Sequence, residues 1–396
     1  MENIENYNFN NKKALIRVDF NVPLNSDLKI TDNTRIKAAV PTIQKVLKGG
    51  GSVILMSHLG RPKKGFEAKF SLSNIVDEVA KLVGCQVKFA NDCIGSETQE
   101  MATALQPGEV LLLENLRFYQ HETAGDKNFA KQLATLGNVY INDAFGTAHR
   151  AHASTAIIAQ FFPTEKMFGY LLEKEIVSVS KVLNEGKSPI TAIVGGAKVS
   201  SKIIIIKKLM EKVDNIIIGG GMAYTFAKAL GGNTGNSLVE DDFIATAKEV
   251  LATAKAKGVK ILIPTDTLAA DHFSDDANTQ ICATNNIPEG WMGLDIGKKA
   301  IEEYADCVQN SNTILWNGPM GVFELPSFQE GTKQIALAVV EATKKGAFSL
   351  VGGGDSVAAI NQFNLANQVS HVSTGGGAML EYLEGKELPG IKAIMD

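Results

Sequence analysis

Short runs of β-branched and aliphatic residues alternate along the whole chain with longer amphipathic stretches, and this alternation limits the possible fold more than any other feature. Such short runs are typical of buried strands, and the longer stretches are typical of the helices that connect parallel strands. The alternation therefore predicts βαβ units and parallel sheets, which means an α/β fold. No internal repeat of about 20 to 50 residues is evident, which argues against a solenoid.

The expected elements form two similar series. In the first series we expect strands at Ala14–Phe20, Ser52–Ser57, Val87–Ala90, Val110–Leu113 and Val139–Ile141, and helices at Asn33–Leu47, Ser71–Leu82 and Lys127–Leu136. In the second we expect strands at Ile190–Val194, Asn215–Ile218, Lys260–Pro264, Thr313–Trp316 and Phe348–Val351, and helices at Ser200–Met210 and Asp241–Lys257. A short helix, Ala378–Leu383, is expected near the end, followed by a tail.

The pattern between the two series predicts a domain boundary. Glu165–Leu183 reads as one long helix, and Asn184–Pro189 contains the glycine and proline that break it. A chain of 396 residues also exceeds one ordinary hydrophobic core. We therefore expect two doubly wound, Rossmann-like domains joined by a long helix and hinge. Their ranges are 1–170 with a returning tail of about 378–396, an interdomain helix and hinge at 171–186, and 187–377.

Composition excludes several classes of protein. A formal net charge of −4 gives no reason to expect a nucleic acid or an anionic membrane as partner. No apolar run approaches the ~20 residues of a transmembrane helix, and the first residues lack a secretory signal, so we expect a cytoplasmic protein. The cysteines have no metal-binding spacing, and we expect buried, reduced thiols at Cys85, Cys93, Cys282 and Cys307.

Arginine is confined to the first 150 residues, whereas lysine is spread over the whole chain. The planar, permanently charged guanidinium is suited to binding phosphate and carboxylate groups through paired hydrogen bonds. Polar segments that carry most of these arginines follow predicted strands, at the sheet edge where open α/β folds bind ligands. The sequence therefore predicts a site for an anion of two or three charges, formed by Arg35, Arg61, Arg117 and Arg150 with His58.

Each of these residues also has a structural interpretation. A lone arginine after a strand is more often part of a surface ion pair, and His149 and His152 could be ordinary core or helix-start residues. Period two places Arg17 on one strand face with Asp19 and Asn21, so Arg17 could simply pair with Asp19. Independent ion pairs, however, would have no reason to avoid residues 151–396, and this favours a joint site.

Glycine-rich turns follow strands in the second half and favour a phosphate-bearing ligand. After Gly195 and Gly196, Lys198 and Lys202 are expected to share one face at the start of a helix, where backbone N–H groups attract anions. The spacing differs from a P-loop, and Gly219–Gly221 lacks the dinucleotide fingerprint, so tight-turn chemistry alone is an alternative there.

The turn Gly352–Gly354 leads into a helix whose first turn carries Asp355 and Ser356. Asp355 could be only an N-cap, but beside a phosphate chain its carboxylate is suited to Mg²⁺. Asn317 and Glu324 follow another predicted strand, and Glu324 could accept hydrogen bonds from ribose hydroxyls.

Together these segments resemble the phosphoglycerate kinase family. The resemblance runs in family order over essentially the whole chain and is carried by Arg17–Pro23, Ser57–Pro62, Glu114–Phe118, Tyr140–His152, Gly195–Lys202, Ile216–Met222, Trp316–Glu324, Gly352–Ser356 and Ser370–Ala378. Two places depart from the family pattern. Ser356 stands where many members have threonine. Residues 118–123 lack the acidic residues that are common there in the family, so we assign no role to that segment.

The resemblance implies the glycolytic conversion of 1,3-bisphosphoglycerate and ADP to 3-phosphoglycerate and ATP, by a monomer that uses Mg²⁺. It implies that 3-phosphoglycerate is held by Asp19, Asn21, Arg35, His58, Leu59, Gly60, Arg61, Arg117 and Arg150. It implies that the nucleotide is held by Gly196, Lys198, Lys202, Gly220, Gly293, Asn317, Glu324, Gly353, Gly354, Asp355 and Ser356, with Mg²⁺ on Asp355. The family fold also returns the C-terminal tail to the first domain.

The implied reaction needs no general base, because its nucleophile in the ATP-consuming direction is a carboxylate that is already ionised. We expect positioning and charge neutralisation instead, by Arg35, Lys198 and the helix start at Gly354. Since the two ligands belong to different domains, we expect closure about hinges within 165–189 and 373–377.

Two other classes of protein remain as alternatives. A nicotinamide-dependent dehydrogenase would share the fold, but the dinucleotide fingerprint is missing and four substrate arginines are excessive for a hydroxy acid. A non-enzymatic anion-binding protein would not need Lys198, Lys202 and Asp355.

Overall fold

The computed structural model describes residues 2–63 and 65–396, and these form two compact units. Unit 1 runs to Val177 and includes Glu387–Asp396, whereas unit 2 is Ser178–Lys386. The division falls inside helix α6 (Tyr170–Leu183), between the expected boundaries at 170 and 187. Helix α13 (Gly376–Leu383) belongs to unit 2, although we expected the returning tail to begin at about 378.

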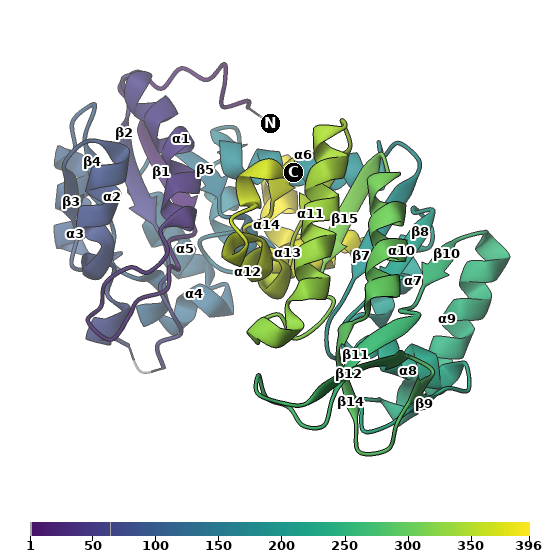
Figure 1. Ribbon diagram of the computed structural model, residues 1–396. Coiled ribbons are helices and arrows are strands. Elements are labelled where there is room, and N and C mark those ends of the chain that lie inside the picture. Colours follow the sequence, from purple (N-terminus) through teal and green to yellow (C-terminus); the bar gives the residue numbers. More distant parts are fainter. Residues whose placement is uncertain (1, 64) are drawn as a thin grey trace. The chain divides into compact units, whose positions relative to one another are not determined.

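Unit 1 is built on a six-stranded, all-parallel sheet in the order β3-β4-β2-β1-β5-β6 (Figure 1). Its strands are β1 (Lys13–Val18), β2 (Ser52–Met56), β3 (Val87–Phe89), β4 (Val110–Leu112), β5 (Val139–Asp143) and β6 (Lys166–Phe168). Its other helices are α1 (Thr34–Lys48), α2 (Val76–Val83), α3 (Ser96–Ala104), α4 (Gln120–Ala124), α5 (Lys127–Ala134) and α14 (Pro389–Met395). Every residue of β2, β4, β5 and β6 is buried, as expected for parallel strands covered on both faces.

The strand order of unit 1 reverses at its centre. The chain leaves β1 toward β2 and leaves β5 toward β6 on the other side, although β1 and β5 are neighbours in the sheet. Ligands of open α/β sheets bind at such a switch point, outside the carboxyl ends of the strands. Asp19 and Asn21 follow β1 at this edge, and Asn142 and Asp143 end β5.

Our prediction of a single helix over Glu165–Leu183 is wrong at its start. Lys166–Phe168 forms strand β6, which pairs in parallel with Tyr140–Asn142 of β5 at the edge of the sheet. Its three residues are buried, so sheet pairing outweighs the local helical pattern. Helix α6 then begins at Tyr170, where the Asp143 carboxylate accepts hydrogen bonds from the N–H groups of Leu171 (2.9 Å) and Leu172 (3.2 Å).

Unit 2 contains a second six-stranded parallel sheet, in the order β10-β8-β7-β15-β16-β17. Its strands are β7 (Ile190–Val194), β8 (Asn215–Ile218), β10 (Lys260–Leu262), β15 (Thr313–Asn317), β16 (Phe348–Val351) and β17 (His371–Val372). Its helices are α7 (Ile203–Leu209), α8 (Met222–Ala229), α9 (Ile244–Lys257), α10 (Lys298–Gln309), α11 (Glu330–Lys344), α12 (Gly354–Gln362) and α13. The strand order reverses between β7 and β15, which places Gly195 and Asn317 at its switch point.

Unit 2 also contains two small sheets that the sequence did not predict. Strands β12 (Thr279–Ala283), β11 (Asp266–Ala270) and β14 (Met292–Ile296) pair antiparallel (Figure 1). Strand β9 (Asn233–Thr234) pairs in parallel with β13 (Asn286–Ile287). The two six-stranded parallel sheets confirm the predicted α/β class. Among the described residues, no helix is long and apolar enough to cross a membrane.

Candidate functional site

The edge beyond β1 in unit 1 brings three of the predicted substrate residues together. Arg35, in the first turn of α1, donates a hydrogen bond of 2.8 Å from Nη1 to Oδ2 of Asp19. His58 follows β2, and its Nδ1 lies 3.9 Å from Oδ1 of Asp19. Burial, followed by the charges of Arg17, Arg117 and Arg35, lowers the pKa of His58 well below its usual value. His58 is therefore neutral at physiological pH.

Arg117 presents a donor that the protein itself leaves unused. Its Nη1 donates to the carbonyl of Gly60 at 2.9 Å, and the Gly60 N–H donates to Oδ1 of Asn21 at 2.8 Å. The Nε of Arg117 is buried and has no hydrogen-bond partner among the described residues. A buried N–H without a partner is costly, so this edge of unit 1 holds a donor that an anion or a water molecule could satisfy.

The remaining predicted residues border the same edge. A hollow of about 370 Å³ is lined in part by Asn21, Leu59 and Gly60. Arg61 and Arg150 are exposed, and neither pairs with a described acid. The charge of Arg61 helps to lower the pKa of Arg117, and that of Arg150 helps to lower the pKa of His152 to about 4, behind burial and the other arginines. The cations predicted for an anion site thus act on one another electrostatically.

Arg17 does not pair with Asp19, so that interpretation is wrong. The Arg17 side chain is completely buried, donates from Nε to Oγ of Ser154 at 2.8 Å, and also donates from Nη1 to the carbonyl of Val18. Ser154 in turn donates to Oε1 of Glu122 at 2.6 Å. Glu122 lies in the segment 118–123 to which we assigned no role, and it too is completely buried.

The glycine turn after β7 in unit 2 corrects our placement of the lysines. Helix α7 begins at Ile203, so Lys202 is its N-cap residue and Lys198 precedes the helix. The two lysines therefore do not share a helix face as we predicted, because Ser200–Lys202 forms turns and the Ser200 N–H and hydroxyl bond to Glu240 instead. The positive φ of Gly196 (136°) and of Gly220 (69°) allows these turns to approach closely.

Asn317 connects the predicted nucleotide residues at the end of β15. Its Oδ1 accepts a hydrogen bond from Nζ of Lys202, and its Nδ2 donates to the carbonyl of Gly352 at 2.8 Å. Burial lowers the pKa of Lys202, while the negative charge of Asp355 acts in the opposite direction. The Gly318 N–H donates to Oγ of the buried Ser356 at 2.5 Å, so the Ser356 hydroxyl already has a structural role.

Asp355 has the chemistry that Mg²⁺ requires. It lies in the first turn of α12, is exposed, and forms no hydrogen bond or ion pair with a described residue. The described residues contain no group of three or more metal-ligating side chains. Mg²⁺ in nucleotide sites is usually held by one or two carboxylates together with phosphate oxygens and water. A single free carboxylate beside Lys202 and a glycine turn fits that mode of binding.

Two more of the predicted nucleotide residues, Gly293 and Glu324, also belong to unit 2. Gly293 is part of β14, and its N–H donates to Oγ of Ser237 at 2.9 Å. Glu324 is exposed, and its carboxylate forms no hydrogen bond or ion pair with a described residue. In the described part of the chain, the side-chain hydrogen bonds of Lys202 and Asn317 join them to each other and to Gly352, not to Gly293 or Glu324.

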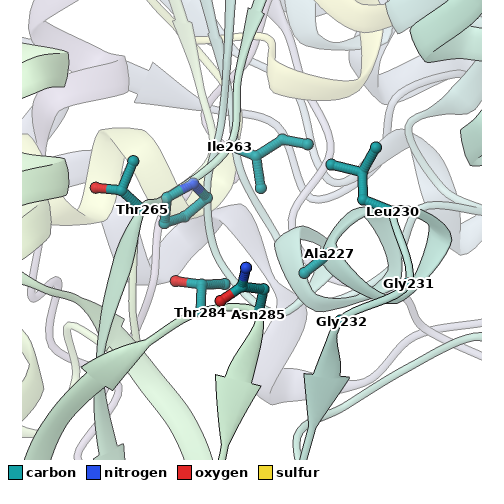
Figure 2. A pocket seen from close by; sticks show the side chains of 9 residues that line it. Ala227, Leu230, Gly231, Gly232, Ile263, Thr265, Thr284 and Asn285 are labelled. Atoms are coloured by element: carbon teal, nitrogen blue, oxygen red, sulfur yellow. The ribbon is translucent and has the colours of Figure 1, made fainter.

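Another cavity in unit 2, of about 360 Å³, has a different lining. Figure 2 shows Leu230 and Ile263 on one side of it and Thr284 and Asn285 on the other. Its lining residues are Ala227, Leu230, Gly231, Gly232, Ile263, Pro264, Thr265, Thr284 and Asn285. None of the predicted nucleotide residues is among them, so this cavity is separate from the candidate site.

Comparison with known proteins identifies the family. The sequence profile of phosphoglycerate kinase matches residues 4–386. The chain is 53% identical to phosphoglycerate kinase of Porphyromonas gingivalis over an alignment of 415 positions, gaps included, which covers 99% of both chains. It is 52% identical to that of Chloroherpeton thalassium, over 99% of this chain and 98% of the other. The solved phosphoglycerate kinase of Coxiella burnetii superposes with a TM-score of 0.89 and 40% identity, over 99% of this chain and 98% of the other. The chain therefore belongs to the phosphoglycerate kinase family.

Proposed function

We propose that this chain transfers a phosphoryl group reversibly between 1,3-bisphosphoglycerate and ADP, giving 3-phosphoglycerate and ATP. One observation carries the substrate half of the proposal: the buried Nε of Arg117 has no partner among the described residues and lies within a cluster of arginines at the switch point of unit 1. Membership of the family supports the reaction, because an ATP-dependent phosphotransferase requires both an anionic acceptor and a nucleotide.

The proposed substrate site uses the residues at the edge of unit 1. Arg61, Arg117 and Arg150 supply cationic N–H groups that form no salt bridge with a described acid, although Glu122 and Asp19 act on Arg117 from a distance. Arg35 is held by Asp19 in a fixed direction, so it loses little side-chain entropy when it binds. Asn21, His58, Leu59 and Gly60 line the same edge and complete the set. The partly exposed Arg35 is the residue that we assign to the transferring phosphoryl group.

The proposed nucleotide site uses the glycine turns of unit 2. Lys202 and Asn317 form one side, Gly353 and Gly354 begin α12, where N–H groups have no partner within the helix, and Lys198 provides an exposed cation after Gly196. Gly220, Gly293, Glu324 and Ser356 complete the proposed set. We assign catalysis to Arg35, Lys198 and Gly354, which neutralise charge that develops on the transferring group.

Asp355 would hold Mg²⁺ together with phosphate oxygens of the nucleotide. The ion would neutralise phosphate charge, while Lys202 and the start of α12 orient the phosphate chain. We also propose a monomeric protein in the cytoplasm. The monomeric state rests on the family resemblance, and light scattering after size-exclusion chromatography tests it.

The two proposed sites belong to different units, so transfer requires both ligands to meet within one closed arrangement. Closure would also exclude water from the phosphoryl group. Small-angle scattering with 3-phosphoglycerate and an ATP analogue should show compaction relative to the free protein. An unchanged radius of gyration with both ligands bound would contradict closure.

A coupled assay that supplies 3-phosphoglycerate and ATP tests the function directly. We expect turnover that depends on both compounds and on Mg²⁺. Binding of either compound should also raise the melting temperature, because a ligand that binds only the native state stabilises it. A protein that binds 3-phosphoglycerate but shows no turnover would instead support a non-enzymatic anion-binding protein.

A further inference from the structure

A buried series of polar side chains in unit 1 leads from Glu122 through Ser154 and Arg17 to His58, and only His58 has a role in the proposed function. Oγ of Ser154 donates to Oε1 of Glu122 at 2.6 Å, and the Ser154 N–H donates to Oε2 at 3.0 Å. Arg17 donates from Nε to Oγ of Ser154 at 2.8 Å, and its Nη2 lies 3.3 Å from Nδ1 of His58. Glu122, Ser154 and Arg17 are completely buried, and His58 is 3% exposed.

The chemistry of the guanidinium fixes the direction of each hydrogen bond in this series. Arginine carries only N–H donors and stays protonated in proteins, so it cannot accept a hydrogen bond. Ser154 must therefore accept from Arg17 with its lone pair and use its single hydroxyl proton for Glu122. Glu122 then receives two donors from Ser154, and its charge balances the buried guanidinium through the shared hydroxyl.

The same reasoning determines where His58 carries its proton. Because Nη2 of Arg17 can only donate, Nδ1 of His58 must be the acceptor, and the proton of the neutral ring lies on Nε2. Asp19 acts against this arrangement, since its Oδ1 would attract a proton to Nδ1. That oxygen is 3.9 Å away, whereas Nη2 of Arg17 is at 3.3 Å, so the contact with Arg17 dominates.

The surrounding charges disfavour a protonated His58. Arg117 and Arg35 both act on its ring in addition to Arg17, and all three lower its pKa. His152 lies with Nδ1 4.0 Å from Oε1 of Glu122, and its own pKa is lowered to about 4, chiefly by burial. The hydroxyl of Tyr140 donates to the backbone carbonyl of Ser154 at 2.7 Å, and this bond fixes the backbone at Ser154. Asp19 and Glu122 are therefore the acidic groups that face this network.

We propose that Glu122, Ser154 and Arg17 are positioning residues that hold His58 as a neutral imidazole with its proton on Nε2, so that His58 donates one directed hydrogen bond to the bound anion. This proposal rests on the proposed function in one respect, namely that His58 contacts 3-phosphoglycerate. A neutral donor is suitable here because the arginines already supply the charge. A further positive charge on His58 would add repulsion among these cations, while a fixed N–H adds direction.

The protonation state of His58 can be measured without any substrate. Long-range ¹H–¹⁵N spectra of the full chain, labelled with ¹⁵N-histidine, distinguish the two neutral tautomers and the imidazolium. The His58 signals are identified by their loss in a His58→Gln variant. We expect the neutral ring with its proton on Nε2 at pH 7. A proton on Nδ1, or protons on both nitrogens, would overturn the proposal.

The Ser154→Ala variant tests the series itself. It removes the acceptor of the Nε of Arg17, so we expect the guanidinium to be held less firmly and the His58 signals to shift toward a mixture of tautomers. The KM for 3-phosphoglycerate should rise about 5- to 10-fold, the loss expected for one hydrogen bond, with kcat within about twofold because ground-state and transition-state binding weaken together. Ser154→Thr keeps the hydroxyl and should restore both readouts.

Ser311→Ala is the matched control, because Ser311 is also buried and its hydroxyl also bonds within a polar pair, with Thr191 at 2.6 Å in unit 2. This control should lower stability without moving the His58 signals or the KM. If Ser154→Ala does not fold, the isosteric Glu122→Gln variant replaces it with the same two measurements. A folded variant with unchanged His58 signals and KM contradicts the positioning role. A wild-type chain with the expected tautomer but no turnover contradicts only the proposed function.

Discussion

Nη1 of Arg35 donates a hydrogen bond of 2.8 Å to Oδ2 of Asp19, and this pair joins helix α1 to the end of strand β1. The Asp19 side chain is 6% exposed and that of Arg35 is 36% exposed, so the acid is fixed within the protein and the cation extends from it. The pair therefore directs a charged group out of the sheet edge, where the proposed anion site lies.

Replacing Arg35 by alanine should remove nearly all turnover and leave the fold intact. Removing a preorganised donor to the developing charge typically lowers kcat by about 100- to 1,000-fold. A partly exposed ion pair contributes little to stability, so the melting temperature should change only slightly. Lys45→Ala is the control, because Lys45 lies on the same helix and pairs with Glu5 at 3.0 Å. Near-normal activity of Arg35→Ala would contradict the assignment.

Replacing Gly353 by alanine should weaken nucleotide binding through a collision with Asn317. Gly353 has a φ of 94°, and an added Cβ would lie 2.4 Å from Nδ2 of Asn317. Gly346 has a φ of 103° but no atom within 4 Å of such a Cβ. Gly346→Ala is therefore the control, because it introduces the same backbone strain without a collision. Both variants should lose about 1 to 3 kcal/mol of unfolding free energy. Only Gly353→Ala should raise the KM for ATP, and equal KM values for the two variants would exclude this role of Asn317.

Replacing Asp355 by asparagine should increase the Mg²⁺ concentration needed for half-maximal activity, by about 10-fold or more, because a carboxylate ligand loses its charge. The measurement is a Mg²⁺ titration of turnover at fixed ATP, or of nucleotide binding by calorimetry. Glu330→Gln provides the comparison, since Glu330 is an exposed acid in the first turn of α11. If both variants shift the titration equally, Asp355 is not a ligand.

The free energy of unfolding should decrease as the pH rises from about 4 to about 6, because of Asp143. Burial raises the pKa of this carboxyl from 3.8 to about 6, against hydrogen bonds from Thr42, Leu172 and Leu171. The native state therefore holds a proton that the unfolded chain has already released between pH 4 and 6, and stability decreases across that window. A difference of two pKa units corresponds to roughly 3 kcal/mol.

An Asp143→Asn variant tests this dependence. Asparagine keeps an oxygen that can accept from the amides of Leu171 and Leu172, yet it cannot ionise. Urea unfolding of both proteins at pH 4.5 and pH 8 should show a smaller change with pH in the variant. An identical pH dependence in the two proteins would rule out Asp143 as its source.

The sequence allowed the two parallel sheets, their switch-point polar residues and the family to be predicted, because each depends on local patterns. Asp19 and His58 come just after strands and Asn317 ends one, so the topology alone brings them to a sheet edge. The roles of these residues stay predictions. The antiparallel β11, β12 and β14 were missed because β12 alternates exposed and half-buried residues without a strongly apolar run.

Other features depend on tertiary contacts that no local pattern encodes. Glu122 lies in a polar segment typical of a surface loop, yet it is buried, and the N–H groups of Ala153 and Ser154 donate to it from a distant part of the sequence. Lys166–Phe168 matches a helical pattern and becomes a strand because β5 offers a free edge. The start of α7 is displaced because Glu240, 40 positions away, binds Ser200.

Unit 1 is completed by the last residues of the chain. The Gly390 N–H donates to the carbonyl of Ala148 at 2.8 Å, Nδ2 of Asn142 donates to that of Gly390 at 3.2 Å, and Nζ of Lys166 donates to that of Ala393 at 2.9 Å. During translation, a ribosome therefore produces all of unit 2 before it releases the segment that covers the end of β5. The first of the two units to be synthesised is therefore the last to acquire its full set of contacts, because Glu387–Asp396 follows all of unit 2 in the sequence.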